Sequence, residues 1–187
     1  MPDVNASALK ALSHPLRTAM LSRLMDRGAA TATQLAQELG ESTGQTSYHL
    51  RQLERHGLVE DDPEHAGGRE RWWRPVAFRA EVADLRGDPQ GRAGLESARQ
   101  WALADRVQVL SRWGAQAVDD PVWAEPATML TSGGNLTVAE AGALSEALEQ
   151  VVREHLSRAE AADKAGRGGE RRRIRVYTDV VPVVEGP

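Results

Sequence analysis

Apolar residues recur at three- and four-residue steps through the first third of the chain, a spacing that is typical of amphipathic helices. The pattern predicts a short helix over residues 6–12 and a second helix that Ser13 caps and that runs to Gly28. Pro15 fits the first turn of the second helix, where a missing backbone N–H is tolerated. Both helices are expected to bury one apolar face and to act as scaffold.

Two helix-start signals follow in close succession. Thr31 and Gln34 stand at the spacing of a capping box, and Gly40 supplies the left-handed residue that ends a helix. The same box recurs from Ser42, and Gly57 ends the second helix. Two such helices joined by a short turn make a helix-turn-helix.

The outer face of the second of these helices is polar, with small hydroxyl groups, one aromatic ring and one guanidinium. Small hydroxyls can approach base edges or phosphates closely, and arginine can bond guanine O6 and N7 in bidentate fashion. A polar face that only meets water is the alternative interpretation. The residues predicted to face a major groove are Thr43, Gly44, Gln45, Ser47, Tyr48 and Arg51.

A β-hairpin is predicted next, with strands over residues 58–61 and 71–76 and a loop that contains the pair Gly67-Gly68. Arg69 follows these glycines and is expected to enter a minor groove or to meet the DNA backbone. Arg71, at the start of the second strand, is a further predicted DNA contact.

Trp72 and Trp73 are consecutive in that strand and therefore point to opposite faces. We expect one of them to close the core of the domain. The other is expected to pack against a partner subunit or the next part of the chain.

Together these features, from about Ala6 to Val76, resemble the winged-helix domain of the ArsR-type bacterial transcription regulators. The resemblance rests on the His-Pro-x-Arg motif from His14 to Arg17, the helix-turn-helix, His-Leu at 49 and 50, and the Gly-Arg wing with paired aromatics. It implies a winged helix-turn-helix fold and a dimeric DNA-binding regulator. Arg17 is expected to reach a DNA phosphate or an internal carboxylate.

The chain departs from that pattern at three points. Gly44 stands where the family often has serine, and Glu41 stands where it often has an apolar residue. No cysteine occurs anywhere, which excludes thiolate metal sites, disulfides and cysteine nucleophiles.

The sequence after residue 78 predicts an organisation different from that of the winged-helix segment. A polar connector over residues 79–90 leads into a helix over 91–118, whose apolar residues cover more than half of its circumference. A stripe this wide indicates contact with its own domain and with a second subunit. A strand over 127–132, a helix that Thr137 and Glu140 cap, and a strand over 173–180 complete a helix-strand-helix-strand unit.

The predicted fold class is therefore mainly α with small β elements, an α+β arrangement. The domains are expected to be a winged helix-turn-helix at 1–78, a connector at 79–90 and an α/β dimerisation or effector domain at 91–187.

The chain has 187 residues and a formal net charge of -4, so nonspecific affinity for DNA should be weak and sensitive to salt. No apolar run approaches the roughly 20 residues of a membrane span, and no leader pattern opens the chain. We expect a cytoplasmic protein.

Catalytic signatures are missing from the sequence. There is no Gly-rich phosphate loop and no metalloprotease motif, and the five histidines are scattered without a partner at metal-binding spacing. We expect neither an enzyme nor a bound cofactor or metal. A small organic effector is the alternative to a metal, and the residues proposed to line its pocket are Trp101, Trp113 and Trp123.

These tryptophans equally fit a role in the core and in the dimer contact. We expect the protein to be a homodimeric transcription regulator, a repressor, that binds an inverted repeat in double-stranded DNA and no membrane. The alternative is a winged-helix module that binds protein through the same face and reads no DNA sequence.

Overall fold

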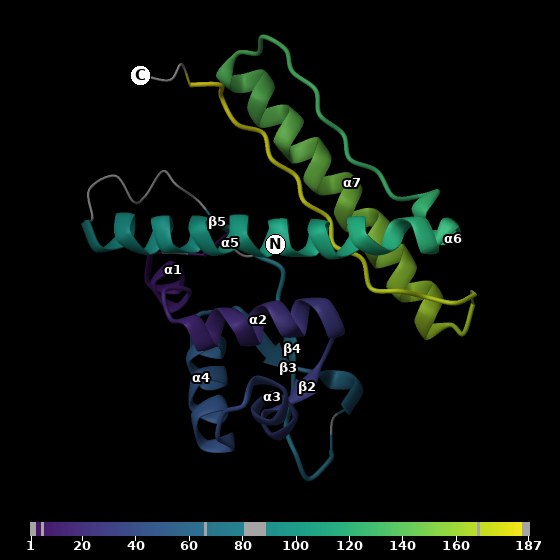
Figure 1. Cartoon of the computed structure of the whole chain (residues 1–187). Coiled ribbons are helices and arrows are strands. Elements are labelled where there is room, and N and C mark those ends of the chain that lie inside the picture. Colours follow the sequence, from purple (N-terminus) through teal and green to yellow (C-terminus); the bar gives the residue numbers. More distant parts are fainter. Residues whose placement is uncertain (1–2, 5, 66, 81–88, 168, 185–187) are drawn as a thin grey trace. The chain divides into compact units, whose positions relative to one another are not determined.

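The computed structural model describes residues 3–4, 6–65, 67–80, 89–167 and 169–184. The chain forms two compact units, Met1–Gln116 and Ala117–Pro187 (Figure 1). No helix within the described ranges has the length and apolar character that a membrane crossing requires.

The first unit opens with two helices, α1 (Ala6–Ala11) and α2 (Pro15–Arg27). The N-cap of α2 is His14 and not Ser13 as predicted, because Nδ1 of His14 accepts the backbone N–H of Leu16 at 3.2 Å. An imidazole nitrogen therefore satisfies a helix-start donor that serine usually satisfies.

The helix-turn-helix consists of α3 (Ala32–Leu39) and α4 (Thr43–Arg55). Both halves of the predicted capping box are present at the start of α3, between Thr31 and Gln34. Gly40 has φ 69°, a left-handed conformation that allows the chain to turn sharply into α4. Thr46 is buried on α4 and donates to the carbonyl of Ala32 at 2.9 Å, so the two helices are held together by a hydrogen bond as well as by packing.

Three strands complete this domain, in the order β2 (Ala30–Thr31), β4 (Trp72–Pro75) and β3 (Val59–Asp61), all antiparallel. The predicted hairpin is confirmed as β3 and β4. Strand β2 was not predicted, since two residues are too few to show an alternating pattern. The chain order is α2, β2, α3, α4, β3, the wing and β4, where the wing is the loop between β3 and β4. This order is that of a winged helix-turn-helix, as the sequence predicted.

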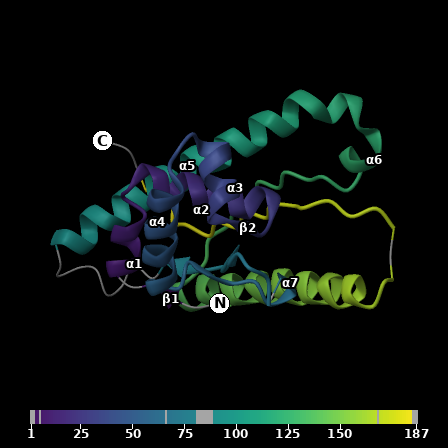
Figure 2. The same ribbon diagram turned by 90° about the horizontal axis from the view of Figure 1, so that it is seen from below.

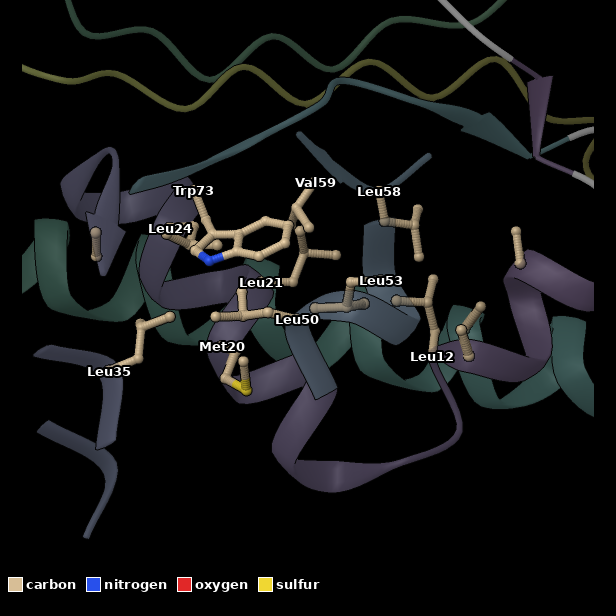
Figure 3. Packing of buried hydrophobic residues seen from close by; sticks show 14 of the residues in the cluster. Leu12, Met20, Leu21, Leu24, Leu35, Leu50, Leu53, Leu58, Val59 and Trp73 are labelled. Atoms are coloured by element: carbon tan, nitrogen blue, oxygen red, sulfur yellow. The ribbon is translucent and has the colours of Figure 1, made fainter. Parts of the chain in front are cut away.

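The core of the unit lies between the helices and this sheet (Figure 3). Trp73 is 3% exposed and lies beside Leu24 and Val59, so it is the tryptophan that closes the core. Each fully buried side chain of this size contributes about 1.5–3 kcal/mol. The fully buried aliphatic residues of the cluster include Leu9, Leu12, Met20, Leu21, Leu24, Leu35, Leu50, Leu53 and Leu58.

Helix α5 (Pro89–Gln116) belongs to this first unit, which differs from the predicted domain 91–187. It packs on α1 and runs past α2 (Figures 1 and 2). Nε1 of Trp101 donates to Oγ of Ser22 at 3.1 Å. The periodicity of α5 showed its apolar face but not which neighbour that face contacts.

The predicted connector 79–90 falls largely on residues 81–88, which lie outside the described residues. Residues 79 and 80 form β5 (Arg79–Ala80), which pairs in parallel with β1 (Asp3–Val4).

The second unit contains a short 3-10 turn (Ala117–Asp119), helix α6 (Pro121–Ala124) and helix α7 (Val138–Lys164). The predicted capping box of Thr137 and Glu140 opens α7. No residue of this unit for which the structure gives an exposure is buried.

The predicted strands 127–132 and 173–180 do not form, which corrects the expected helix-strand-helix-strand arrangement. Alternating apolar residues favour an extended chain, but a strand also requires a neighbour that accepts and donates its backbone hydrogen bonds. Neither segment pairs with another strand in the described part of the chain.

Candidate nucleic-acid interface

Helix α4 presents one polar face to solvent and one apolar face to the core. Leu50 and Leu53 are buried on the inner side, whereas Tyr48 on the outer side is 57% exposed. The predicted contacts Thr43, Gly44, Gln45 and Arg51 are exposed, and Ser47 is half-buried. All six predicted contacts on α4 thus belong to its solvent side.

Gly44 occupies open space, since a Cβ added there would have no atom within 4 Å. A serine would fit at this position without any displacement. The glycine therefore leaves additional room on the outer face of α4 and is not required by packing.

A shallow cleft of about 220 Å³ lies between the start of α3, the outer face of α4 and strand β4. Oγ1 of Thr33 donates to Glu70 at 2.8 Å, which joins α3 to the wing. The cleft brings residues of α4 and of the wing together, and its polar lining residues are Thr33, Thr43, Ser47, Arg51, Glu70 and Arg71.

The arginines near this cleft fall into two classes. Arg51 and Arg69 make no hydrogen bond or ion pair with any other residue that the structure describes, so their guanidinium groups are available to a ligand. Arg74 is paired with Glu60 across the hairpin, with Nη2 and Oε1 at 2.7 Å.

Arg71 differs from the other predicted arginine contacts. It forms ion pairs with Glu54 on α4 and with Asp61 on β3, and its Cζ lies 3.9 Å from the ring centroid of Trp73. Hydrogen bonds to Asp61 and Glu54 raise the pKa of Arg71 above its ordinary value. These contacts favour an internal role for Arg71 over the predicted contact with DNA.

The base of the wing is organised around Asp62, which is buried. Its Oδ2 lies 2.7 Å from Nδ1 of His65, and its Oδ1 accepts the N–H of Glu64 at 3.3 Å. Burial alone raises the pKa of Asp62, but the hydrogen bonds from His65 and Glu64 outweigh it, so the pKa lies below its ordinary value.

His65 in turn stacks on Trp72, with ring centroids 3.9 Å apart and an interplanar angle of 12°. The second tryptophan of the pair therefore supports the wing and lies on the side away from the core. The Asp-x-x-His spacing was the only sequence signal for this arrangement, and it is too common to be specific.

Two of the scattered histidines come together in the fold. His14 and His49 lie with ring centroids 4.2 Å apart, although 35 positions separate them in the chain. His49 is 7% exposed, and its Nδ1 has no hydrogen-bond partner. Within the described residues, no group of three or more His, Asp or Glu side chains is arranged to hold a metal ion.

Burial is the main reason that the pKa of His49 lies below its ordinary value, and nearby His14 and Arg17 lower it further. Arg17 donates from Nε to the carbonyl of Ala11 and pairs with no carboxylate among the described residues, so the expected contact with a phosphate stays a prediction.

The three tryptophans of the predicted effector pocket are divided between the two units. Trp101 packs against the core, and Trp113 is half-buried on the same helix, α5. Trp123 lies in α6 of the second unit, where the guanidinium of Arg172 is 5.3 Å from its ring centroid. The contacts of Trp101 match the alternative role in packing, and the pocket itself stays a prediction.

Residues 12–62 match the family model of a helix-turn-helix domain, which is about a quarter of the chain. The chain therefore contains a helix-turn-helix domain. No curated protein matches its sequence.

Two solved structures are similar to the chain at low identity. The transcriptional regulator Tm0710 from Thermotoga maritima is 12% identical over 77% of this chain and 79% of its own, with a TM-score of 0.33. A mutant of ZitR from Lactococcus lactis in its apo form is 15% identical over 76% of this chain and 83% of its own, with a TM-score of 0.34. Overall similarity at this level carries no argument about the function of the present chain.

Proposed function

We propose that this protein is a sequence-specific DNA-binding transcription regulator. The observation that carries the proposal is the exposed outer face of α4 with Arg51, beside a wing with Arg69, since neither arginine has a partner among the described residues. In this arrangement α4 enters the major groove and Arg69 reaches the adjacent minor groove or backbone. Arginine in the major groove discriminates guanine, whereas contacts with the backbone supply affinity without sequence preference.

The electrostatics favour specific over nonspecific binding. The net charge is -4, and Arg71 and Arg74 are already neutralised by carboxylates of the same domain. These two guanidinium groups are therefore not available to phosphates, so binding to random DNA is weak and disappears as salt rises.

The acting form is a homodimer. Leu103 and Val107 on α5 are 58% and 63% exposed, although large aliphatic side chains are usually buried. Leu103 follows Trp101 by two residues, about 200° around the helix, so it lies opposite the side that packs on the domain. A second copy covers this apolar face and presents two α4 helices to half-sites about 34 Å apart in an inverted repeat.

The domain is of the ArsR type, and the regulator acts as a repressor. An organic molecule, and not a metal held by thiolates, is its effector, because the sequence contains no cysteine. The effector binds one dimer geometry more tightly than another and thereby changes the spacing of the α4 helices. A screen for metabolites that raise the melting temperature and lower DNA affinity tests the effector proposal. Chelators should leave DNA binding unchanged.

The test of the central proposal is selection of bound sites from random and genomic duplex DNA. The expected result is enrichment of an inverted repeat whose binding weakens as salt rises. Failure to enrich any sequence at low salt overturns the proposal and leaves the alternative, a winged-helix module that binds protein.

A further inference from the structure

Arg71 contacts three elements of the winged domain at once. From its place beside β4 it bonds Glu54 in the last turn of α4, through Nη1 at 3.3 Å and through Nη2. It also bonds Asp61 at the end of β3, through Nη2 at 2.7 Å and through Nε. Its Cζ lies over the ring of Trp73, 3.9 Å from the ring centroid, and Trp73 is the residue that closes the core.

This geometry uses four of the five N–H donors of the guanidinium. Three of its nitrogens donate to carboxylates, and its aromatic contact occupies one face. The group also contains two carboxylates for one arginine, so its net charge is negative and repels a phosphate. A residue in this environment is poorly suited to hold the DNA backbone.

The position of the partners explains what the cluster can do. Glu54 follows Arg51 by three residues on α4, so the two side chains are neighbours on one side of the helix. Asp61 is directly opposite Trp73 in the β3–β4 ladder, at the point where the hairpin leaves the sheet to become the wing. Arg71 therefore joins the part of α4 next to Arg51 to the root of the wing that carries Arg69.

We infer that Arg71, held by Glu54 and Asp61, is a positioning residue that fixes the wing relative to the recognition helix α4. It lets Arg51 and Arg69 meet neighbouring grooves at the same time and does not itself contact DNA. The statement about grooves rests on the proposed function, whereas the link between the wing and α4 does not.

The inference and simple electrostatics predict opposite effects of Glu54→Gln on DNA affinity. This change removes a negative charge close to the interface, so electrostatics alone predicts tighter DNA binding. Loss of the link predicts weaker binding, because an unrestrained wing must lose entropy when it binds. Glu60→Gln is the matched control, since Glu60 lies on the same hairpin, pairs with Arg74 and does not bond Arg71.

The first measurement is backbone hydrogen exchange of the full-length protein without DNA. Glu54→Gln and Arg71→Lys should each speed exchange in the wing about threefold to tenfold, while the core helices keep wild-type rates. Lysine retains the charge but loses the planar fork and its stacking on Trp73. Glu60→Gln should leave exchange at the root of the wing unchanged.

The second measurement is affinity for the selected DNA site at fixed salt. Glu54→Gln and Arg71→Lys should both bind about threefold to tenfold more weakly, and Glu60→Gln as tightly as the wild type or tighter. Unchanged exchange in both variants, or DNA binding by Glu54→Gln that equals or exceeds the wild type, overturns the positioning role. If the exchange rates respond but the wild type selects no DNA site, the link stands and the proposed function fails.

Discussion

The imidazole rings of His14 and His49 lie with centroids 4.2 Å apart, where the start of α2 meets the inner side of α4. His14 caps α2 through Nδ1, and His49 is buried with its own Nδ1 unpartnered. Arg17 adds a third basic group, and Glu41 is the acidic group that raises the pKa of His49. A proton on His49 therefore enters a buried and largely cationic surrounding, which opposes its uptake.

The free energy of unfolding should decrease as the pH falls below 6.5. The pKa of His49 in the folded protein lies below the ordinary 6.5, chiefly because of burial, so the unfolded chain binds the proton first. The pKa of His56 is lowered in the same direction, by burial and by Arg17 and Arg55. The stabilising contribution is complete above pH 6.5 and is lost as the pH falls from 6.5 through the folded pKa values.

Urea unfolding at pH 7.5 and about pH 5.5 measures this loss. His49→Phe should flatten the dependence, and His155→Gln, at an exposed position of α7, should leave it as in the wild type. An identical dependence in His49→Phe contradicts the assignment to His49.

Arg51→Ala should lower affinity for the selected site by about 1–3 kcal/mol and relax the preference at one base pair. The reason is loss of a bidentate contact with a base edge in the major groove. Arg27→Ala removes the same charge from the end of α2 and should affect all sequences weakly and equally. Binding of wild-type strength and preference by Arg51→Ala contradicts the orientation of α4 on DNA.

Arg69→Ala should weaken binding to all sequences to a similar degree. A contact with the backbone releases counterions, so the slope of log affinity against log salt should fall by about 1 when it is removed. Titrations of the selected site and a scrambled site at several salt concentrations measure both effects. A change in base preference would instead assign Arg69 a role in reading sequence.

Val107→Glu should convert the dimer to a monomer and abolish tight binding to the inverted repeat. A carboxylate at an apolar contact loses hydration without gaining a partner. Gln108→Glu places the same charge at the next exposed position of α5 and should leave the dimer intact. Sedimentation at micromolar concentration should give twice the chain mass for the wild type and for Gln108→Glu.

Removal of residues 117–187 should leave the first unit folded. The residues of the buried cluster all precede Gln116, and the second unit contributes no buried residue for which exposure is described. Thermal unfolding of residues 1–116 should remain cooperative, within a few degrees of the transition of the intact protein. A truncation at residue 91 is expected to unfold, because it removes α5 from its contacts with α1.

Features that depend on residues a few positions apart were predicted well. The capping boxes at Thr31 and Thr137 and the wing strands are local, since each is determined by short-range hydrogen bonds or by alternation. The outer face of α4 also followed from helical periodicity. In contrast, the partners of Arg71 come from 10 and 17 positions away, a separation at which no sequence pattern indicates contact.

The same limit explains the errors in the second half. The sequence of 173–180 alternates as a strand does, but pairing depends on a neighbour that no local pattern supplies. His14, and not Ser13, caps α2. The sequence did not show this, because the orientation of the imidazole ring next to Pro15 is set only in the folded turn.

Helix α5 is tied to α2 at two separate points. Trp101 bonds Ser22, and Arg112 bonds Asp26 at 3.0 Å, so the bonded residues are eleven positions apart on α5 and four positions apart on α2. At 1.5 Å per residue, the two bonds start about 16 Å apart on α5 and about 6 Å apart on α2, so each one resists rotation of α5 about the other. In the proposed homodimer, a small change in how two copies meet along α5 therefore changes the distance between their α4 helices, and with it the half-site spacing that the dimer binds.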